Sequence, residues 1–167
     1  MIITHTETII RLVLIAVLSG VIGLEREFHR KPAGIRTNIM VGLGATLMTI
    51  ASARALDMFG GGVVDPTRIA AQIITGIGFI GAGAILRPTA DGSDNVVGLT
   101  TAATLWVVAG LGIAIGLGLF FEAIVATLLV VGTFVGLNTI VNDVRRRALN
   151  GTVVRPPGSQ RNDNLPR

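Results

Sequence analysis

Long apolar runs, separated by short polar segments, dominate the pattern of this chain. A helix needs about 20 mostly apolar residues to cross a lipid bilayer. Runs of this kind predict three membrane-spanning helices in the first part of the chain, near residues 9–24, 37–53 and 67–86. Arg11 lies close to the start of the first run, and we expect its long side chain to reach the membrane interface. A cleaved signal peptide is the alternative for this run, but no A-x-A cleavage pattern follows it.

The second part of the chain is a longer stretch, residues 96–142, in which Glu122 is the single charged residue. As one straight helix it would be about 70 Å long at 1.5 Å per residue, more than twice the bilayer's apolar core of about 30 Å. We therefore predict one turn near Gly116 and two helices, over residues 99–115 and 119–141. The predicted fold class is an all-α membrane protein with five transmembrane helices.

Composition supports this class. Half of the residues are hydrophobic and only 14% are charged, against about 25% charged in an ordinary soluble domain. A soluble domain of about 150 residues still exposes roughly 30% of its unfolded surface, so it could not hide so many apolar side chains. The 22 glycines also fit, because glycine is more frequent in membrane helices than in soluble ones. We expect an integral, multi-pass membrane protein that is in contact with the lipid bilayer.

Basic residues predict the orientation. They gather between the first two helices and again after the fifth. These residues are Arg26, Arg30, Lys31 and Arg36, and then Arg145, Arg146, Arg147, Arg155, Arg161 and Arg167. With five helices both groups lie on one side, which the positive-inside rule assigns to the cytoplasm. We therefore predict a transmembrane domain over residues 1–143, with the N-terminus outside and the C-terminus inside. Residues 144–167 are basic, contain proline, and are expected to form a disordered cytoplasmic tail.

A glycine motif in the third apolar run has two interpretations. Gly76, Gly78 and Gly81 match the G-x-G-x-x-G spacing of dinucleotide-binding folds. That fingerprint needs a strand before the glycines and an acidic residue about 20 positions after them. Here Asp65 and the proline after it predict a helix start, and the acidic residue is missing. We therefore predict that these glycines and Gly83 form a helix-packing face.

Polar residues in or near the membrane helices are candidates for function. Asp65 and Arg68 are most simply a helix cap and an interfacial anchor on the outer side, with a ligand-binding role as the alternative. Gln72 lies one turn inside a membrane helix, where polar groups usually bond to another helix. Glu122 lies near the outer end of the fifth helix. It is a functional candidate if it is buried in the bundle, and an ordinary residue if it is interfacial.

A second group of polar residues belongs to the inner side. The predicted topology brings Glu25 and Arg26 at the end of the first helix to the same face as Arg36, Thr100 and Thr101. Such a polar cluster could dock another membrane protein, bind an anion, or form the mouth of an ion path. The simpler interpretation is a set of interfacial anchors in which Glu25 pairs with Arg36 and the threonine hydroxyls bond to their own helix.

The residue types do not favour catalysis. Cysteine is absent, and His5 and His29 lie on opposite sides of the first apolar run. Disulfides, thiolate ligands and a histidine-based metal site are therefore not expected. No Ser/His/Asp set, and no lone nucleophile with a base nearby, can be assembled from the sequence. We expect neither an enzyme nor a bound metal, cofactor or nucleic acid.

Three blocks of sequence resemble the MgtC/SapB family of bacterial inner-membrane proteins. The blocks are GLERE at 23–27 with KPAGIRT at 31–37, RIAAQ at 68–72 with TGIGFIGAGAIL at 75–86, and GLTTAATLW at 98–106. Their order and spacing match across roughly residues 10–140. The resemblance implies five helices with a cytoplasmic C-terminus, in agreement with the count made from the apolar runs.

The resemblance also implies a role in adaptation to low magnesium or other stress and, in some pathogens, in virulence. The best-described member binds the membrane sector of the F-type ATP synthase and restrains ATP synthesis. That member has a functionally linked asparagine at the position of Thr100, so this chain departs from it there. Longer members carry a cytoplasmic domain after the fifth helix. We expect this chain to resemble the membrane core alone and to lack regulation through that domain.

Together these features predict a non-enzymatic modulator in the bacterial inner membrane. It would bind another membrane protein complex, for which the F-type ATP synthase is one candidate, and could also assemble with copies of itself. The alternative is a small ion or solute transporter, linked to magnesium, that works as an oligomer. Its polar pathway would use Gln72, the threonine pair at 100–101 and Glu122.

Overall fold

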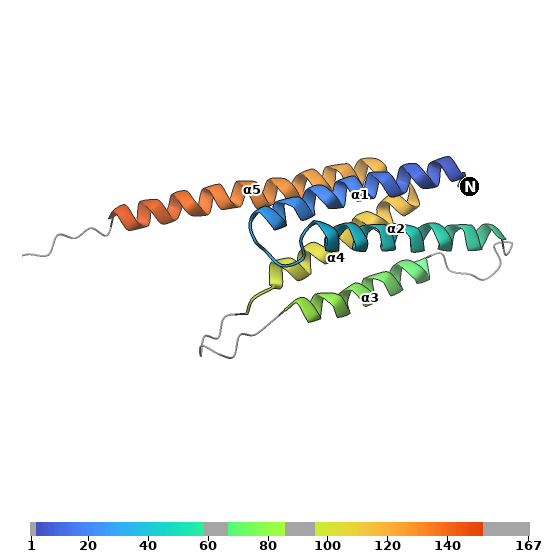
Figure 1. Cartoon of the computed structure of the whole chain (residues 1–167), viewed down its shortest axis with the longest axis horizontal. Coiled ribbons are helices and arrows are strands. Elements are labelled where there is room, and N and C mark those ends of the chain that lie inside the picture. The colour runs from blue at the N-terminus through green and yellow to red at the C-terminus, as the bar shows by residue number, and fades with distance from the viewer. Residues whose placement is uncertain (1–2, 59–66, 86–95, 152–167) are drawn as a thin grey trace, which may run out of the picture. The chain divides into compact units, whose positions relative to one another are not determined.

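The computed structural model describes residues 3–58, 67–85 and 96–151. Within these ranges the chain forms five α-helices and no β-strand (Figure 1). The helices are α1 (His5–Phe28), α2 (Ile35–Met58), α3 (Thr67–Ala84), α4 (Leu99–Leu117) and α5 (Phe120–Gly151). The all-α class predicted from the sequence is therefore confirmed.

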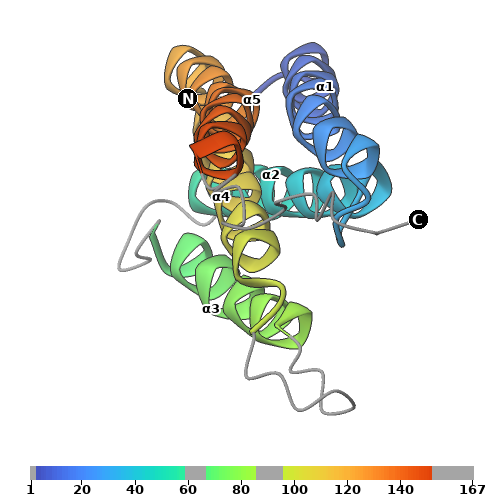
Figure 2. The same ribbon diagram turned by 90° about the vertical axis from the view of Figure 1, so that its left-hand side faces the viewer.

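The chain divides into two compact units, Met1–Gly132 and Thr133–Arg167. In the first unit α2 packs against both α1 and α4, and α3 packs mainly against α4. Figure 2 shows α4 at the centre of this unit, with α3 on one side and α1 and α2 on the other. Helices α1 to α4 run in alternating directions, so the ends of α1 and α3 lie at the same end of the unit as the starts of α2 and α4.

The helix bounds differ from the predicted ones mainly at the C-terminus. Helices α3 and α4 begin at the expected residues, whereas α5 continues to Gly151. Residues 144–151 are therefore helical, although they were expected to belong to a disordered tail. The reason is local composition, because residues 145–149 read RRRAL, and Arg, Ala and Leu are strong helix formers. The rest of the expected tail, residues 152–167, lies outside the described residues.

The apolar surface of α1 indicates a membrane environment. By length and composition, α1 and α4 could each cross a bilayer, and shorter apolar helical segments cover Arg68–Ala84 and Phe120–Gly136. Large apolar side chains of α1 point outward at every third or fourth position. They are Ile10, Val13, Val17, Val21, Leu24 and Phe28. The buried face of the same helix carries Arg11, Ser19 and Arg26. This is the reverse of a soluble amphipathic helix, whose polar face meets water.

Glycines allow α2 and α4 to approach each other closely. A Cβ atom added at Gly112 would lie 2.7 Å from the Cβ of Ala45, and one at Gly116 would lie 2.5 Å from the Cβ of Thr49. Real side chains could not occupy either position without moving α2. Small residues at spacing four serve this purpose in membrane helices, and Gly112 and Gly116 have this spacing.

Candidate functional site

Buried polar side chains are distributed through the helical bundle of the first unit. They are Arg11, Ser19, Arg26, Asn38, Thr46, Thr49, Thr101, Thr104 and Thr127. Buried polar groups need hydrogen-bond partners, and buried charges need pairing. The identity of those partners therefore decides whether each residue stabilises the bundle or is available for a ligand.

Arg11 is only 2% exposed and joins three helices. Its guanidinium donates to the backbone carbonyl of Gly116 at the end of α4 and pairs with Glu7 one turn earlier in α1. It also lies 5.8 Å from the centroid of the Phe120 ring in α5, within range of a cation–π interaction. The Arg11 side chain therefore lies inside the protein, beside the turn between α4 and α5. The C-terminus of α4, with its partial negative charge, holds this side chain inside the bundle.

Glu25 and Arg26 form a buried ion pair at the end of α1. The side chains are 8% and 6% exposed, and the Arg26 Nη1 atom lies 3.6 Å from Glu25 Oε2. Glu25 Oε1 lies 3.0 Å from the Nδ1 atom of His29. Arg36 is exposed and is not an ion-pair partner of Glu25. The expected pairing of Glu25 with Arg36 is therefore wrong, because two nearer basic side chains on α1 take its place.

The turn between α1 and α2 is held by two side chains, Glu27 and Asn38. The Glu27 carboxylate accepts a hydrogen bond of 2.9 Å from the backbone N–H of Ile35 at the start of α2. The amide nitrogen of buried Asn38 donates to the carbonyls of Ala33 (2.6 Å) and Gly34 (2.9 Å). An acidic residue ahead of a helix start is a recognisable signal, because a carboxylate is favourable at a helix N-terminus.

The two adjacent threonines of α4 have different surroundings. Thr101 is buried, whereas Thr100 is exposed. Just before them, Gly98 has a φ of 101°, and a Cβ there would collide with the carbonyl of Ala84 at the end of α3. This contact brings the end of α3 to the start of α4. The polar cluster expected on the inner side is therefore divided. Thr101 is buried, whereas Thr100 and Arg36 are exposed.

Most buried hydroxyls already donate to backbone carbonyls. The donor–acceptor pairs four residues apart within one helix are Ser19–Ile15, Thr49–Ala45, Thr104–Thr100 and Thr127–Ala123. Thr46 instead donates across the α2–α4 interface to the Gly112 carbonyl at 3.0 Å. These hydroxyls therefore stabilise helices and one helix–helix contact.

The candidates that were expected on the outer side are exposed where the structure describes them. Glu122 lies exposed in the first turn of α5, so it is not buried in the bundle. Gln72 is also exposed and makes no hydrogen bond to another helix within the described residues, unlike the expected interhelical contact. Arg68 is exposed at the start of α3. Asp65 lies outside the described residues.

The glycines of α3 divide into one that packs and three that do not. A Cβ at Gly81 would lie 3.5 Å from the Cβ of Ala102 in α4. At Gly76, Gly78 and Gly83 an added Cβ would meet nothing within 4 Å in the part of the chain that the structure describes. The packing role predicted for the motif therefore has a partner within this unit only at Gly81, and the other three glycines leave α3 open.

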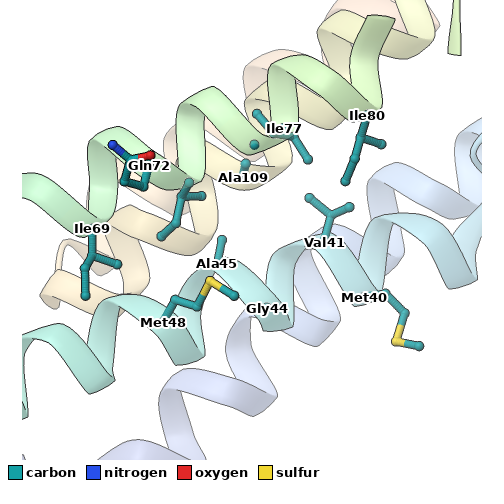
Figure 3. Close-up of a pocket in the computed structure, with 12 residues that line it drawn as sticks. Met40, Val41, Gly44, Ala45, Met48, Ile69, Gln72, Ile77, Ile80 and Ala109 are labelled. Atoms are coloured by element: carbon teal, nitrogen blue, oxygen red, sulfur yellow. The ribbon is translucent and has the colours of Figure 1, made fainter. Parts of the chain in front are cut away.

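A groove lies between α2 and α3, with a cavity volume of about 510 Å³. Helix α2 contributes Met40, Gly44 and Met48, α3 contributes Gln72 and Gly76, and Ala109 of α4 lies behind them (Figure 3). We call this the α2–α3 groove. Among the described residues that line it, Gln72 is the one polar residue. Such a surface favours an apolar ligand with a single polar anchoring point.

Comparison with known proteins assigns the family. The sequence model of the MgtC family matches residues 12–143. The Escherichia coli (strain K12) protein named "Putative magnesium transporter YhiD" is 47% identical over 137 residues, covering 77% of this chain and 60% of that protein.

SapB of Bacillus subtilis (strain 168) is 41% identical over 127 residues, covering 74% of this chain and 53% of that protein. MgtC of Brucella abortus (strain 2308) is 40% identical over 139 residues, covering 83% of this chain and 55% of that protein. The chain thus matches 53–60% of the length of these relatives. No solved structure matches it significantly. The matched region takes in all three sequence blocks, and the chain belongs to the MgtC family.

Proposed function

We propose that this protein is a non-catalytic modulator in the bacterial inner membrane, acting in adaptation to low magnesium by binding another membrane protein complex. The magnesium link is supported by the family and by the name of the Escherichia coli relative. The F-type ATP synthase is the candidate partner that the family resemblance implies.

The proposal includes five membrane crossings with the N-terminus outside. The alternating directions of α1 to α4 support it, as do apolar side chains that point outward from helices beyond α1 and α4. Examples are Met40 and Met48 on α2 and Phe121 and Leu128 on α5. In water such a surface would promote aggregation, whereas in a bilayer it contacts lipid.

The observation that carries the proposal is the pair of open glycines on α3, Gly78 and Gly83, which lie on either side of Phe79 around the helix. Most buried hydroxyls and Arg11 are bonded within the bundle, whereas Gly78 and Gly83 face open space beside Phe79, which is 84% exposed. Small residues let a second membrane helix approach closely where lipid supplies no hydrophobic drive. An aromatic side chain beside them can anchor such a contact. Exposed Arg36 and Thr100 add polar groups at the inner end.

Co-purification from native membranes tests this function. Cells grown at low magnesium should yield a stable complex with the wild-type protein, and Gly78→Leu should reduce the captured partner at least fivefold by blocking the close approach. Gly132→Leu is the matched control, because a Cβ there also meets nothing within 4 Å among the residues that the structure describes. Equal capture by both variants would reject the proposal. Unchanged ATP synthesis by membrane vesicles that lack the protein would reject the ATP synthase as the partner.

A transporter is the second candidate, and buried oxygen atoms favour it. Both carboxylate oxygens of Glu25 and the Oδ1 atom of Asn38 are buried and accept no hydrogen bond within the described residues, although Glu25 forms ion pairs. Carboxylate and amide oxygens are suitable ligands for Mg²⁺. Ion flux into liposomes that contain the purified protein separates the candidates. Flux that is lost in Glu25→Gln supports transport, whereas the modulator should move no ions.

A further inference from the structure

Four residues of α3 form a stripe along the helix that changes from charged, through polar, to apolar. Arg68, Gln72, Gly76 and Ile80 follow one another at spacing four, which places them on the same face of a helix. The last three line the α2–α3 groove. Arg68 and Gln72 are exposed and have no hydrogen bond or ion pair within the described residues. Two polar groups that have no partner among the described residues therefore lie in line with an apolar groove.

The order of these side chains matches that of a phospholipid from head to tail. Arg68 is in the first turn of α3, where the helix dipole also favours an anion. Gln72 lies one turn deeper, about 6 Å along the axis at 1.5 Å per residue. Beyond it the stripe is apolar. A guanidinium pairs well with a phosphate group, an amide N–H can donate to an ester carbonyl, and Gly76 and Ile80 offer an apolar track for an acyl chain.

The walls of the groove also fit a flexible acyl chain. Its volume of about 510 Å³ is within the roughly 300–1,000 Å³ typical of ligand pockets. Gly44 and Gly76 have open space on opposite walls. Met40 is 73% and Met48 is 57% exposed, and methionine adapts its shape to irregular apolar partners. In Figure 3, Ile69, Gln72 and Met48 lie at one end of the groove, and Met40 and Ile80 lie at the other.

We propose that the α2–α3 groove binds one phospholipid of the surrounding bilayer, with a preference for an anionic headgroup. Arg68 binds the phosphate, the Gln72 amide donates to a glycerol ester carbonyl, and one acyl chain lies along the groove. The site requires the protein to lie in a bilayer, but it does not require the partner complex. Because α2 and α3 share few direct contacts, a bound lipid would fill the space between them and support α3.

Native mass spectrometry of the purified full-length protein tests this site. The probes are phosphatidylglycerol and phosphatidylcholine with identical acyl chains, added to protein in a mild detergent. We expect one tightly bound phosphatidylglycerol per chain, held at least fivefold more tightly than phosphatidylcholine. Arg68→Ala should remove that preference. Gly76→Leu should weaken binding of both lipids at least tenfold, because its side chain would occupy the groove.

Gly78→Leu is the matched control, since both glycines have open space but only Gly76 lines the groove. The Gly78→Leu variant should bind lipid like the wild type, even if it no longer captures the partner complex. The lipid site and the proposed function can therefore fail independently. If Gly76→Leu does not fold, Gly44→Leu fills the groove from α2. Equal lipid binding by groove and control variants would overturn the site. So would a groove variant that abolishes a dimer and leaves lipid binding intact, which would assign the groove to a second copy.

Discussion

At the scale of single residues, Arg11 is the most demanding group in the fold. A charged side chain inside a membrane bundle is costly unless its donors have partners. Glu7 supplies a charge one turn away, and the Gly116 carbonyl supplies an acceptor from α4. Phe120 adds an aromatic face from α5. One side chain therefore links the start of α1 to the α4–α5 turn, and its loss should weaken more than one helix contact.

Replacing Arg11 with methionine tests this link. Methionine keeps much of the length but removes the charge and all donors, so the Gly116 carbonyl and Glu7 lose their partner. Because hydrogen bonds to charged groups contribute about 1.5–3 kcal/mol, we expect the free energy of unfolding to fall by about 2 kcal/mol, seen as a lower melting temperature in detergent. Arg36→Met, at an exposed position, is the control and should change stability little. Equal melting of the two variants would contradict the role of Arg11.

At the scale of helices, close packing is concentrated where α2 meets α4. The glycines at this interface have backbone or Cβ atoms of the other helix within 3 Å of an added Cβ. The same helix α4 also buries the larger side chains of Leu105, Val108 and Ile115. We therefore expect close packing at the α2–α4 interface to contribute to the stability of the bundle, although glycine by itself is a weak helix former.

Gly112→Ala should destabilise the bundle although alanine favours helices. The added Cβ would lie 2.7 Å from both the Ala45 Cβ and the Gly42 carbonyl oxygen, and overpacking costs about 1–3 kcal/mol. Gly110→Ala makes the same change in the same helix where nothing lies within 4 Å. It should be neutral or stabilising by up to about 1 kcal/mol. Membrane abundance and melting temperature of the pair would show the difference, and a stabilising Gly112→Ala would refute the close contact.

Helices and their order could be predicted from sequence, but helix faces could not. Apolar run length is local information, and it was enough to predict five helices with nearly correct starts. In the sequence, Gly112 and Gly116 look like Gly76, Gly78 and Gly83, because all five lie in apolar, glycine-rich helices. The first two contact α2, whereas the other three face open space. Which face meets a neighbour depends on contacts between residues far apart in sequence, as does the burial of Arg11 by the end of α4.

At the scale of the whole molecule, the alternating helix directions place the α1–α2 turn and the α4–α5 turn at opposite ends of the first unit. The turn between α1 and α2 carries Lys31. The turn between α4 and α5 contains Gly118, with a φ of 88°, and Leu119. If the first unit crosses the bilayer as proposed, these turns lie on opposite sides. The positive-inside rule then assigns the turn with Lys31 to the cytoplasm.

Single cysteines can test this orientation directly, because the natural sequence contains none. In intact spheroplasts, a membrane-impermeant maleimide should label Leu119→Cys and leave Lys31→Cys unlabelled until the membrane is opened. Both positions are exposed, so a difference in labelling reports sidedness rather than burial. The reverse pattern would invert the topology and move the exposed Arg36 and Thr100 to the outside, away from any cytoplasmic part of a partner. Equal labelling of both positions would mean that the α1–α4 bundle does not separate two compartments, and the modulator and transporter proposals would then both fail.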